Sequence, residues 1–531
     1  MPVIKLKNIS QKLYLYLRKQ PWHWWLAVLI TLIAGFLRIY RIPETVMFLG
    51  DQGRDAIIVS RIFKELNPVF IGPVTSVGNM YLGPFYYYFM LPFLWISYPS
   101  PLGPVYAVAI FSTITVFLMY IFGKKMYSPM VGLLASFLLA FSAEAIDISR
   151  FSWNPNLAPL FSLLMIYFSW KAFKNPKNWI VVTFLFSLII QLHYMTLLTG
   201  ITAGFLWLYQ LIIKLRQNSS SQKKELVFQT IKIIIISCLV FLLTLVPQIL
   251  FDIRHKGLIS SAFKDMFTKE AVFSDKRATG LTENISSLVS YSQTRANHIL
   301  VRIPFNRIGH YEQLLLFSII TMLIVRFYLQ KKNIKPLNKF QQTTFFIVTT
   351  FLILGIIGTA VYREPVYNHY IAYLYPVIFL VYALVLDFLL KLNKKIFIFP
   401  ILAFLGWFLV NNYQRWPLEP NYMYQRTKQV TEQIYRSLDD QEKYEIVLLS
   451  GTKDLYGQSY RYFLSTTDKP PIIRDKGETP DTLVIIDEEK KAKDVTALPI
   501  YEIVVFPEKS INEFYGNCDK PDVYFLRKHP N

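Results

Sequence analysis

Apolar residues occur along this chain in long runs separated by short polar connections. Most runs are near the length of about 20 residues that an α-helix needs to cross a bilayer. The first, 22–40, follows several basic residues and has no small-residue cleavage site, so we interpret it as a retained helix and not a signal peptide. Ten more runs cover 104–122, 127–145, 157–173, 178–194, 196–214, 230–250, 311–329, 342–361, 369–390 and 395–411. The pattern predicts about eleven transmembrane helices.

The segment 81–95, YLGPFYYYFMLPFLW, is also apolar but differs from these runs. It is shorter, and Pro84 and Pro92 interrupt it. Counting it as a span would add a twelfth crossing and move the pair Lys124–Lys125 to the outside. We therefore predict a helix that lies in the membrane interface.

Basic residues between the runs predict the orientation, because cytoplasmic connections carry an excess of Lys and Arg. With the N-terminus inside, every dense cluster falls on the cytoplasmic side: Lys124–Lys125, Lys171–Lys177, Lys214–Lys224, Lys331–Lys339 and Lys391–Lys395. The longer segments 41–103 and 251–310 and the tail from 412 then lie outside. The pattern predicts an N-in, C-out polytopic α-helical protein of the cell membrane.

The pattern changes after Tyr413. Short strand-like runs follow a polar helical stretch at 424–438, which is typical of a small α/β domain. We divide the chain into a transmembrane domain at 1–411, with external loops 41–103 and 251–310, and an extracytoplasmic α/β domain at 412–531. The predicted strands are Ile446–Ser450, Thr482–Ile486 and Tyr501–Phe506.

Composition agrees with a membrane protein. Hydrophobic residues make up 53% of the chain and charged residues only 17%, whereas soluble domains are about a quarter charged. The mean hydropathy is +0.33. The net charge of +21 arises mostly in the connections between spans. It therefore reflects topology, and a nucleic-acid partner, which would need one basic soluble face, is excluded.

The first external loop opens with the motif Phe48–Ala56, FLGDQGRDA. The motif predicts a short helix on which Asp51, Arg54 and Asp55 share one face by their i, i+3 and i+4 spacing. A carboxylate at the membrane surface can act as a general base on an acceptor hydroxyl. The simpler alternative is a capped helix that carries a surface ion pair.

Other candidate residues lie at the predicted outer ends of the spans. Basic side chains there can stabilise negative charge on a bound group, because cations and hydrogen-bond donors lower its energy. Each has a simpler interpretation: a histidine held by a neighbouring helix, headgroup anchoring, or an aromatic belt at the interface. The basic candidates are Arg54, Arg150, His193, Arg254, His255, Arg302, Arg363 and His369.

Trp153 and Asn154, in the loop SRFSWNPN, can supply stacking and hydrogen bonds for a bound ligand. Alternatively, Asn154 and Pro155 begin the next helix, since Pro is tolerated in a first turn.

The motifs GDQGRDA, YLGPFYYY, SPLG and SRFSWNPN occur in an order that resembles a known family. The order is similar to that of the GT-C superfamily of phospholipid-carrier-dependent glycosyltransferases. The resemblance is closest to bacterial relatives of protein O-mannosyltransferases and aminoarabinose transferases, and it covers about the first 390 residues.

This resemblance implies that the first external loop carries the catalytic acid, a role that falls on Asp51. Many relatives have a second acidic residue directly after it, where this chain has Gln52. Either Asp55 supplies the second carboxylate or there is only one. A requirement for a divalent cation therefore stays open.

The resemblance implies an inverting glycosyltransferase. It would move a sugar from a polyprenyl-phosphate donor to a lipid, glycan or protein acceptor on the outer face. Asp51 would be the base, Asp55 would orient Arg54 or bind the acceptor, and Arg54, Arg150, His193 and Arg254 would hold the donor. The alternatives are a transporter or flippase for lipid-linked glycans and an inactive relative that acts as an assembly partner.

Overall fold

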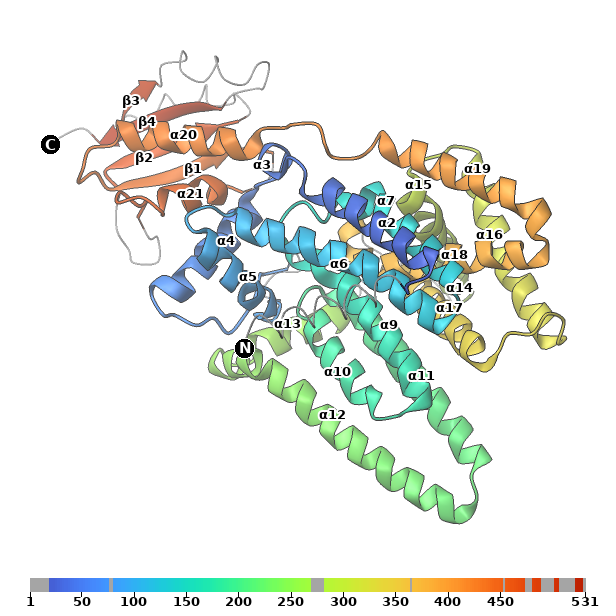
Figure 1. Ribbon diagram of the computed structural model, residues 1–531. Coiled ribbons are helices and arrows are strands. Elements are labelled where there is room, and N and C mark those ends of the chain that lie inside the picture. The colour runs from blue at the N-terminus through green and yellow to red at the C-terminus, as the bar shows by residue number, and fades with distance from the viewer. Residues whose placement is uncertain are drawn as a thin grey trace, which may run out of the picture.

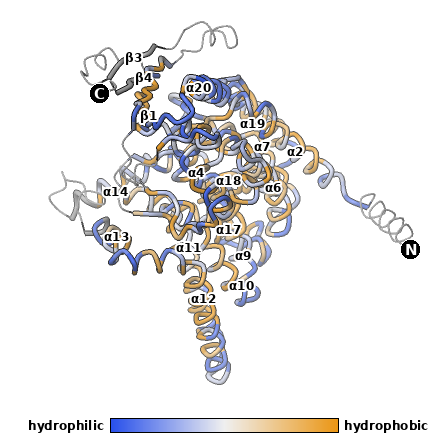
Figure 2. Tube along the Cα trace, turned by 90° about the vertical axis from the view of Figure 1, so that its left-hand side faces the viewer, coloured by the Kyte–Doolittle hydropathy of each residue, from blue (hydrophilic) through white to orange (hydrophobic). Residues whose placement is uncertain are grey.

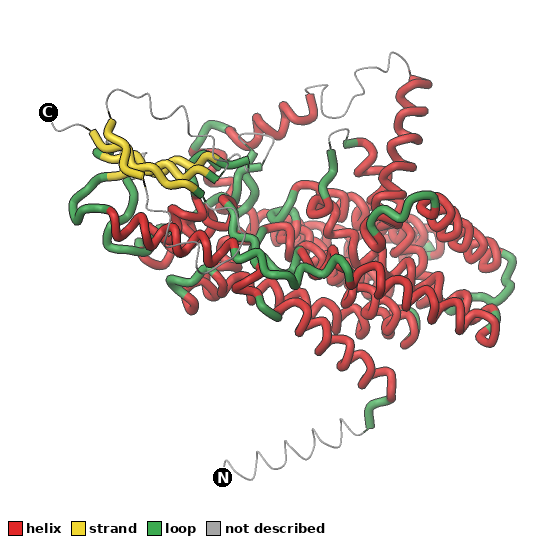
Figure 3. Tube along the Cα trace, turned by 90° about the horizontal axis from the view of Figure 1, so that it is seen from above, coloured by secondary structure: helices red, strands yellow, loops and turns green. Residues whose placement is uncertain are grey.

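The computed structural model describes residues 19–75, 80–268, 281–362, 365–451, 454–472, 480–488, 501–505 and 521–528 (Figure 1). Most of these residues are helical. A small β-sheet lies at one end of the molecule, beside the helical bundle (Figure 3).

Each of the eleven predicted apolar runs contains a helix. Eight helical segments in the described part of the chain are long and apolar enough to cross a membrane. The protein is therefore a multi-pass helical membrane protein. Helices α7 and α10 are apolar but shorter, and α9 has 17 residues. The count of eleven crossings thus stays a prediction. The helices are α2 (Trp22–Ile39), α6 (Leu102–Met126), α7 (Pro129–Phe141), α9 (Ala158–Lys174), α10 (Asn178–Ile189), α11 (Leu197–Gln217), α12 (Ser220–Arg254), α16 (Tyr311–Lys331), α17 (Lys339–Val361), α18 (Tyr375–Leu392) and α19 (Lys394–Tyr413).

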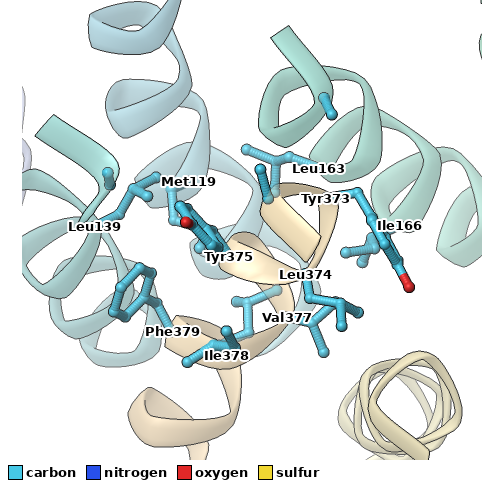
Figure 4. Close-up of a cluster of buried hydrophobic side chains, with 14 of the residues drawn as sticks. Met119, Leu139, Leu163, Ile166, Tyr373, Leu374, Tyr375, Val377, Ile378 and Phe379 are labelled. Carbon is cyan, nitrogen blue, oxygen red and sulfur yellow. The ribbon is translucent and has the colours of Figure 1, made fainter. Parts of the chain in front are cut away.

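Helix α18 forms the centre of the bundle. Its side chains from Tyr375 to Leu384 are all buried, and it packs against α7, α9, α16, α17 and α19. Tyr375 lies beside Met119 of α6 and Leu139 of α7 (Figure 4). The apolar runs thus fold into one continuous core.

Small residues let α6 and α7 approach closely. A Cβ atom on Gly123 would lie 2.8 Å from the Cα atom of Gly132 on the facing helix. Membrane helices use such contacts because van der Waals packing, and not the hydrophobic effect, drives their association.

Helix α12 has a different environment. None of its residues is buried, although most of its length is apolar (Figure 2). Exposed Leu239, Leu242 and Leu243 are compatible with a helix that faces lipid.

The loop 41–103, which the sequence predicts to be external, forms α3 (Ile42–Thr45), α4 (Gly50–Lys64) and α5 (Phe85–Ser97). Helix α5 contains Pro92 and corresponds to the ambiguous segment 81–95. Its 13 residues extend about 20 Å, which is short of the ~30 Å hydrocarbon core. This length favours the interfacial interpretation.

Further elements connect the spans at the end of the bundle that carries α4. The described ones are α8 (Ala143–Asp147), η1 (Asn154–Leu157), η2 (Tyr194–Thr196), α13 (Leu258–Thr268), α14 (Leu281–Asn297), η3 (His298–Arg302), α15 (Ile303–Phe305) and η4 (Asn368–Leu374).

The tail contains a four-stranded sheet with strand order β1-β2-β4-β3. Strands β1 and β2 are parallel and are connected through α21, and β4 is antiparallel to both of its neighbours. The predicted helix and three predicted strands are present, whereas β4 was not predicted. The elements are α20 (Met423–Ser437), β1 (Tyr444–Leu449), α21 (Gln458–Leu464), β2 (Thr482–Asp487), β3 (Tyr501–Val505) and β4 (Asp522–Lys528).

Candidate active site at the start of helix α4

Helix α4 places the acidic motif at its first two turns. The helix begins at Gly50, and the side-chain Oε1 atom of Gln52 accepts a hydrogen bond of 2.9 Å from the backbone N–H of Leu49. Gln52 therefore satisfies a donor at its own helix start, as in a capping box. Gln52, which occupies the position of the second acidic residue in many relatives, thus has a local role in starting the helix.

Arg54 connects the two carboxylates of the motif. Its Nη1 atom lies 2.8 Å from Oδ1 of Asp51, and its Nε and Nη2 atoms lie 2.9 and 2.8 Å from Oδ1 of Asp55. The predicted shared face of Asp51, Arg54 and Asp55 is therefore present. The guanidinium holds the Asp51 side chain in a defined orientation.

The two carboxylates have opposite exposure. The Asp55 side chain is fully buried, whereas that of Asp51 is 46% exposed. Tyr87 of α5 donates a hydrogen bond of 3.1 Å to Oδ1 of Asp55. The interpretation as a surface ion pair is thus wrong for Asp55, and Asp51 is the more exposed of the two carboxylates.

Burial also sets the proton affinity of Asp55. Desolvation raises the pKa of Asp55 to about 6, and the Arg54 guanidinium opposes this shift by favouring the charged form. Near pH 7 the carboxylate is therefore mostly ionised and paired with Arg54, and Asp55 acts on the site through Arg54.

The C-terminal domain packs directly on this motif. A Cβ atom on Gly53 would lie 2.3 Å from the backbone oxygen of Gln458 in α21, and one on Gly50 would lie 2.3 Å from Oδ2 of Asp454. The two glycines thus permit a close approach that any side chain would block.

This contact brings a third carboxylate, Asp454, close to Asp51. Oδ2 of Asp454 accepts a hydrogen bond of 2.8 Å from the backbone N–H of Gln458, at the start of α21. Burial raises the pKa of Asp454, and the negative charge of Asp51 raises it further. The sequence analysis missed Asp454, although the glycines at 50 and 53 were a signal of close packing around the acidic motif.

We expect Gly53→Val to displace α21 from α4. Overpacking of a tight contact costs about 1–3 kcal/mol, and here the clash is with backbone atoms that cannot rotate away. Amide hydrogen exchange in 458–464 should become faster. The matched control is Gly406→Val, because an added Cβ atom at that position in α19 meets no atom within 4 Å. Unchanged protection in Gly53→Val would contradict this packing.

An aromatic cluster from three loops lies near Asp51. The rings of Trp153 and His369 have centroids 4.4 Å apart, and those of His193 and Tyr370 are 4.5 Å apart. The His193 and His369 rings are 6.3 Å apart, and His369 is close enough to Asp51 for an electrostatic interaction. The structure thus brings together Trp153, His193 and His369, which the sequence identified separately.

Backbone contacts hold this cluster in place. The side-chain amide of Asn154 donates to the backbone oxygen of Leu192, and Nδ1 of His193 accepts from the N–H of Met195 at 3.2 Å. Asn154 also begins η1, which continues into α9. The interpretation of Asn154–Pro155 as the start of a helix is confirmed.

Arg150 forms hydrogen bonds with the end of α2 and the segment that follows it. Its side chain is buried, and it donates hydrogen bonds to the backbone oxygens of Leu37 and Tyr40 and to the hydroxyl of Thr45. These acceptors lie at and just after the end of α2, where backbone carbonyls lack helical partners. We therefore leave Arg150 out of the proposed donor site and assign it a structural role.

The remaining basic candidates lie elsewhere. Arg254 is exposed at the end of α12, and the ring of His255 stacks on Phe251 with centroids 3.9 Å apart. No hydrogen bond or ion pair within the described ranges joins either residue to α4. Arg302 pairs with Glu312 at 3.1 Å, and Arg363 lies outside the described residues.

The described residues do not form an evident metal site. Among them, no group of three or more His, Cys, Asp or Glu side chains is arranged to hold a metal ion. Asp51 and Asp454 supply two carboxylates only. We therefore derive no step through a metal ion.

Comparisons with known proteins identify the fold. No family model and no curated protein sequence matches the chain. Among solved structures, the chain is similar to ArnT from Cupriavidus metallidurans bound to undecaprenyl phosphate, with a TM-score of 0.57 and 10% identity. The similarity covers 94% of this chain and 97% of that one.

The chain is also similar to the oligosaccharyltransferase from Archaeoglobus fulgidus. One structure of that protein is a complex with zinc and sulfate, and the match has a TM-score of 0.53 and 13% identity over 84% of this chain and 62% of that one. Another holds a tethered acceptor peptide with an NVT sequon and matches with a TM-score of 0.52, 12% identity and coverage of 85% and 64%. The present chain thus spans less than two thirds of that protein. These matches confirm the predicted resemblance, and the chain has the fold of the GT-C glycosyltransferases.

Proposed function

We propose that this protein is an inverting glycosyltransferase that uses a polyprenyl-phosphate-linked sugar as its donor. The acceptor is a hydroxyl or similar group on a lipid, glycan or protein at the extracytoplasmic surface. The fold shared with ArnT and the oligosaccharyltransferase supports this class of reaction. The single observation that carries the assignment is the half-exposed Asp51 carboxylate, which Arg54 holds at the start of α4.

Asp51 acts as the general base in this proposal. The acceptor hydroxyl gives its proton to the Asp51 carboxylate while its oxygen attacks the anomeric carbon of the donor sugar. The bond from that carbon to the phosphate oxygen breaks on the opposite face, and polyprenyl phosphate leaves with the bonding electrons. One displacement at one carbon inverts its configuration.

The aromatic cluster receives the donor. Trp153 and His369 provide a partly exposed ring surface near Asp51 on which a sugar can stack. The imidazoles of His193 and His369 have N–H groups that stabilise the charge developing on the leaving phosphate. Asp55 is a positioning residue in this scheme, because it fixes Arg54, which in turn orients Asp51.

An apolar groove supports a lipid-linked donor. It has a volume of about 580 Å³ and lies between α10, α11 and α12. Gly200 and Gly204 of α11 form part of its wall, and Gly200 lies in the first turn of α11, which follows His193 and η2 directly. A polyprenyl chain in this groove would place its phosphate near the aromatic cluster.

We expect Gly204→Leu to weaken the use of long-chain donors. An added Cβ atom at Gly204 meets no atom within 4 Å, so the leucine side chain occupies groove space without disturbing the helices. Displacing two CH₂ groups of the lipid costs about 1.6 kcal/mol, or roughly a 15-fold higher KM.

Two controls make this test specific to the groove. A short-chain donor should show little change in the Gly204→Leu variant. The matched variant Gly406→Leu is also on an open helical glycine, but outside the groove. Equal effects of both substitutions, or none with the long-chain donor, would remove the groove from the proposal.

The proposed function is tested by sugar incorporation with purified protein. A radiolabelled sugar on a synthetic polyprenyl-phosphate carrier should be transferred to an acceptor extract, with release of polyprenyl phosphate. A transporter would move the carrier across vesicles without consuming it, and an inactive relative would do neither. Either of those results would contradict the assignment.

A further inference from the structure

A large basic cleft lies at the end of the bundle opposite to Asp51. Its volume is about 770 Å³, and it is lined by residues of α6, α9, α10 and α17 together with the turn between α9 and α10. Helices α6 and α9 begin near the loops that carry the proposed active site and end at this cleft, whereas α10 and α17 begin at the cleft. The cleft is therefore separated from the proposed active site by the length of the membrane-spanning helices.

Four lysines contribute to its wall: Lys125, Lys171, Lys174 and Lys339. No acidic residue lines the cleft, and none of these four lysines forms an ion pair with another residue that the structure describes. Ammonium groups gathered without counter-charges repel one another, so an anion bound among them would be stabilised.

The remaining wall has the character of a membrane boundary. Aromatic side chains line it beside the lysines: Tyr167, Trp170, Phe173 and Phe340. Nζ of Lys171 lies 5.7 Å from the ring centroid of Tyr167, and the indole N–H of Trp170 donates to the backbone oxygen of Phe340 at 3.3 Å. Phe340 is 53% exposed. A small soluble anion has no apolar part that could pack on this surface, whereas the glycerol and first acyl carbons of a lipid would cover it.

We propose that this cleft binds the phosphate-bearing headgroup of an anionic phospholipid in the leaflet opposite to the active site. Basic clefts between transmembrane helices bind such headgroups in this way. The predicted orientation makes that leaflet the cytoplasmic one. Lipid binding at this cleft does not require sugar transfer, so it can be tested separately from the proposed function.

The topology signal alone does not explain the cleft. Lys223 and Lys224, in the connection between α11 and α12, belong to another predicted cytoplasmic cluster, yet they are exposed on α12 and do not line this cleft. They provide a control with the same change of charge.

The test is native mass spectrometry of the full-length protein in detergent, titrated with phosphatidylglycerol or phosphatidylcholine. We expect the wild-type protein to retain phosphatidylglycerol preferentially. Lys171→Gln/Lys174→Gln should weaken this binding by about 30-fold, because the double variant removes two positive charges that each attract the phosphate. Lys125→Gln/Lys339→Gln should act similarly, and Lys223→Gln/Lys224→Gln should stay within about twofold of wild type.

Two results would overturn the proposal. One is equal retention of phosphatidylglycerol by the cleft variants and by the control variant, with unchanged melting temperatures. The other is displacement of the lipid by equimolar inorganic phosphate or glycerol phosphate, which would identify a soluble anion as the ligand. Failure of inorganic phosphate to compete at a large excess would support the lipid as the source of the phosphate.

Discussion

Replacing Asp51 with Asn is expected to lower the rate of sugar transfer by about 10²–10⁴-fold, the usual contribution of a general base. Asn has nearly the same size and can still accept a hydrogen bond from Arg54, so folding and membrane insertion should be unaffected. The measurement is kcat with a saturating polyprenyl-phosphate donor, normalised to folded protein. The expected loss is in kcat, because the proton is transferred only in the reacting complex.

The other two carboxylates near α4 are the controls. Asp454→Asn keeps the cap of α21 and should change kcat only a few-fold. Asp55→Asn should mainly reduce stability, because the Asp55 side chain is buried against Arg54 and Tyr87. If Asp51→Asn stayed near wild type while one of the controls abolished transfer, the base would be a different carboxylate.

Arg54→Gln should strongly destabilise the protein. The substitution leaves the buried Asp55 carboxylate without its cation, and an uncompensated buried charge costs about 3–5 kcal/mol. The measurement is the free energy of unfolding in detergent at neutral pH. The double variant Arg54→Gln/Asp55→Asn removes the charge as well and should recover most of the lost stability.

The pH dependence of the Arg54→Gln variant gives a further check. Burial already raises the pKa of Asp55 to about 6, and loss of Arg54 should raise it more. The folded state then binds a proton more tightly than the unfolded state, so stability rises as the pH falls below the folded pKa. A destabilisation that is equal at pH 5 and pH 8, or that the double variant does not relieve, would contradict this account.

The features that the sequence predicted correctly are those with a local cause. Each long apolar run became a helix, because hydrophobicity and length are properties of one segment. The shared face of Asp51, Arg54 and Asp55 followed from helical spacing alone. The helix 423–437 and strands β1 to β3 also carried their own periodic patterns.

Features that depend on distant segments could not be predicted. Strand β4 has charged residues at both of its ends, and its place between β2 and β3 comes from pairing rather than from its own pattern. Asp454 lies about 400 positions from Asp51 and reaches it only because α21 packs on Gly50 and Gly53. The exposure of the two carboxylates could not be predicted either, since Asp51 and Asp55 have similar sequence surroundings but opposite burial.

The basic candidates illustrate the same limit. Arg150 is an outer-end arginine in sequence, yet its donors go to carbonyls at the end of α2. His193 and His369 come from loops more than 170 residues apart, and only the packing of η2 against η4 brings them together with Trp153. A sequence pattern can propose such residues but cannot show which of them meet.

The stereochemistry of transfer tests the central claim most directly. Purified protein would be supplied with a donor of known anomeric configuration, and the configuration of the product would be determined by NMR. A single displacement assisted by Asp51 predicts a product of inverted configuration from the wild-type protein and almost none from Asp51→Asn. A product of retained configuration, or undiminished transfer by Asp51→Asn, would contradict the account.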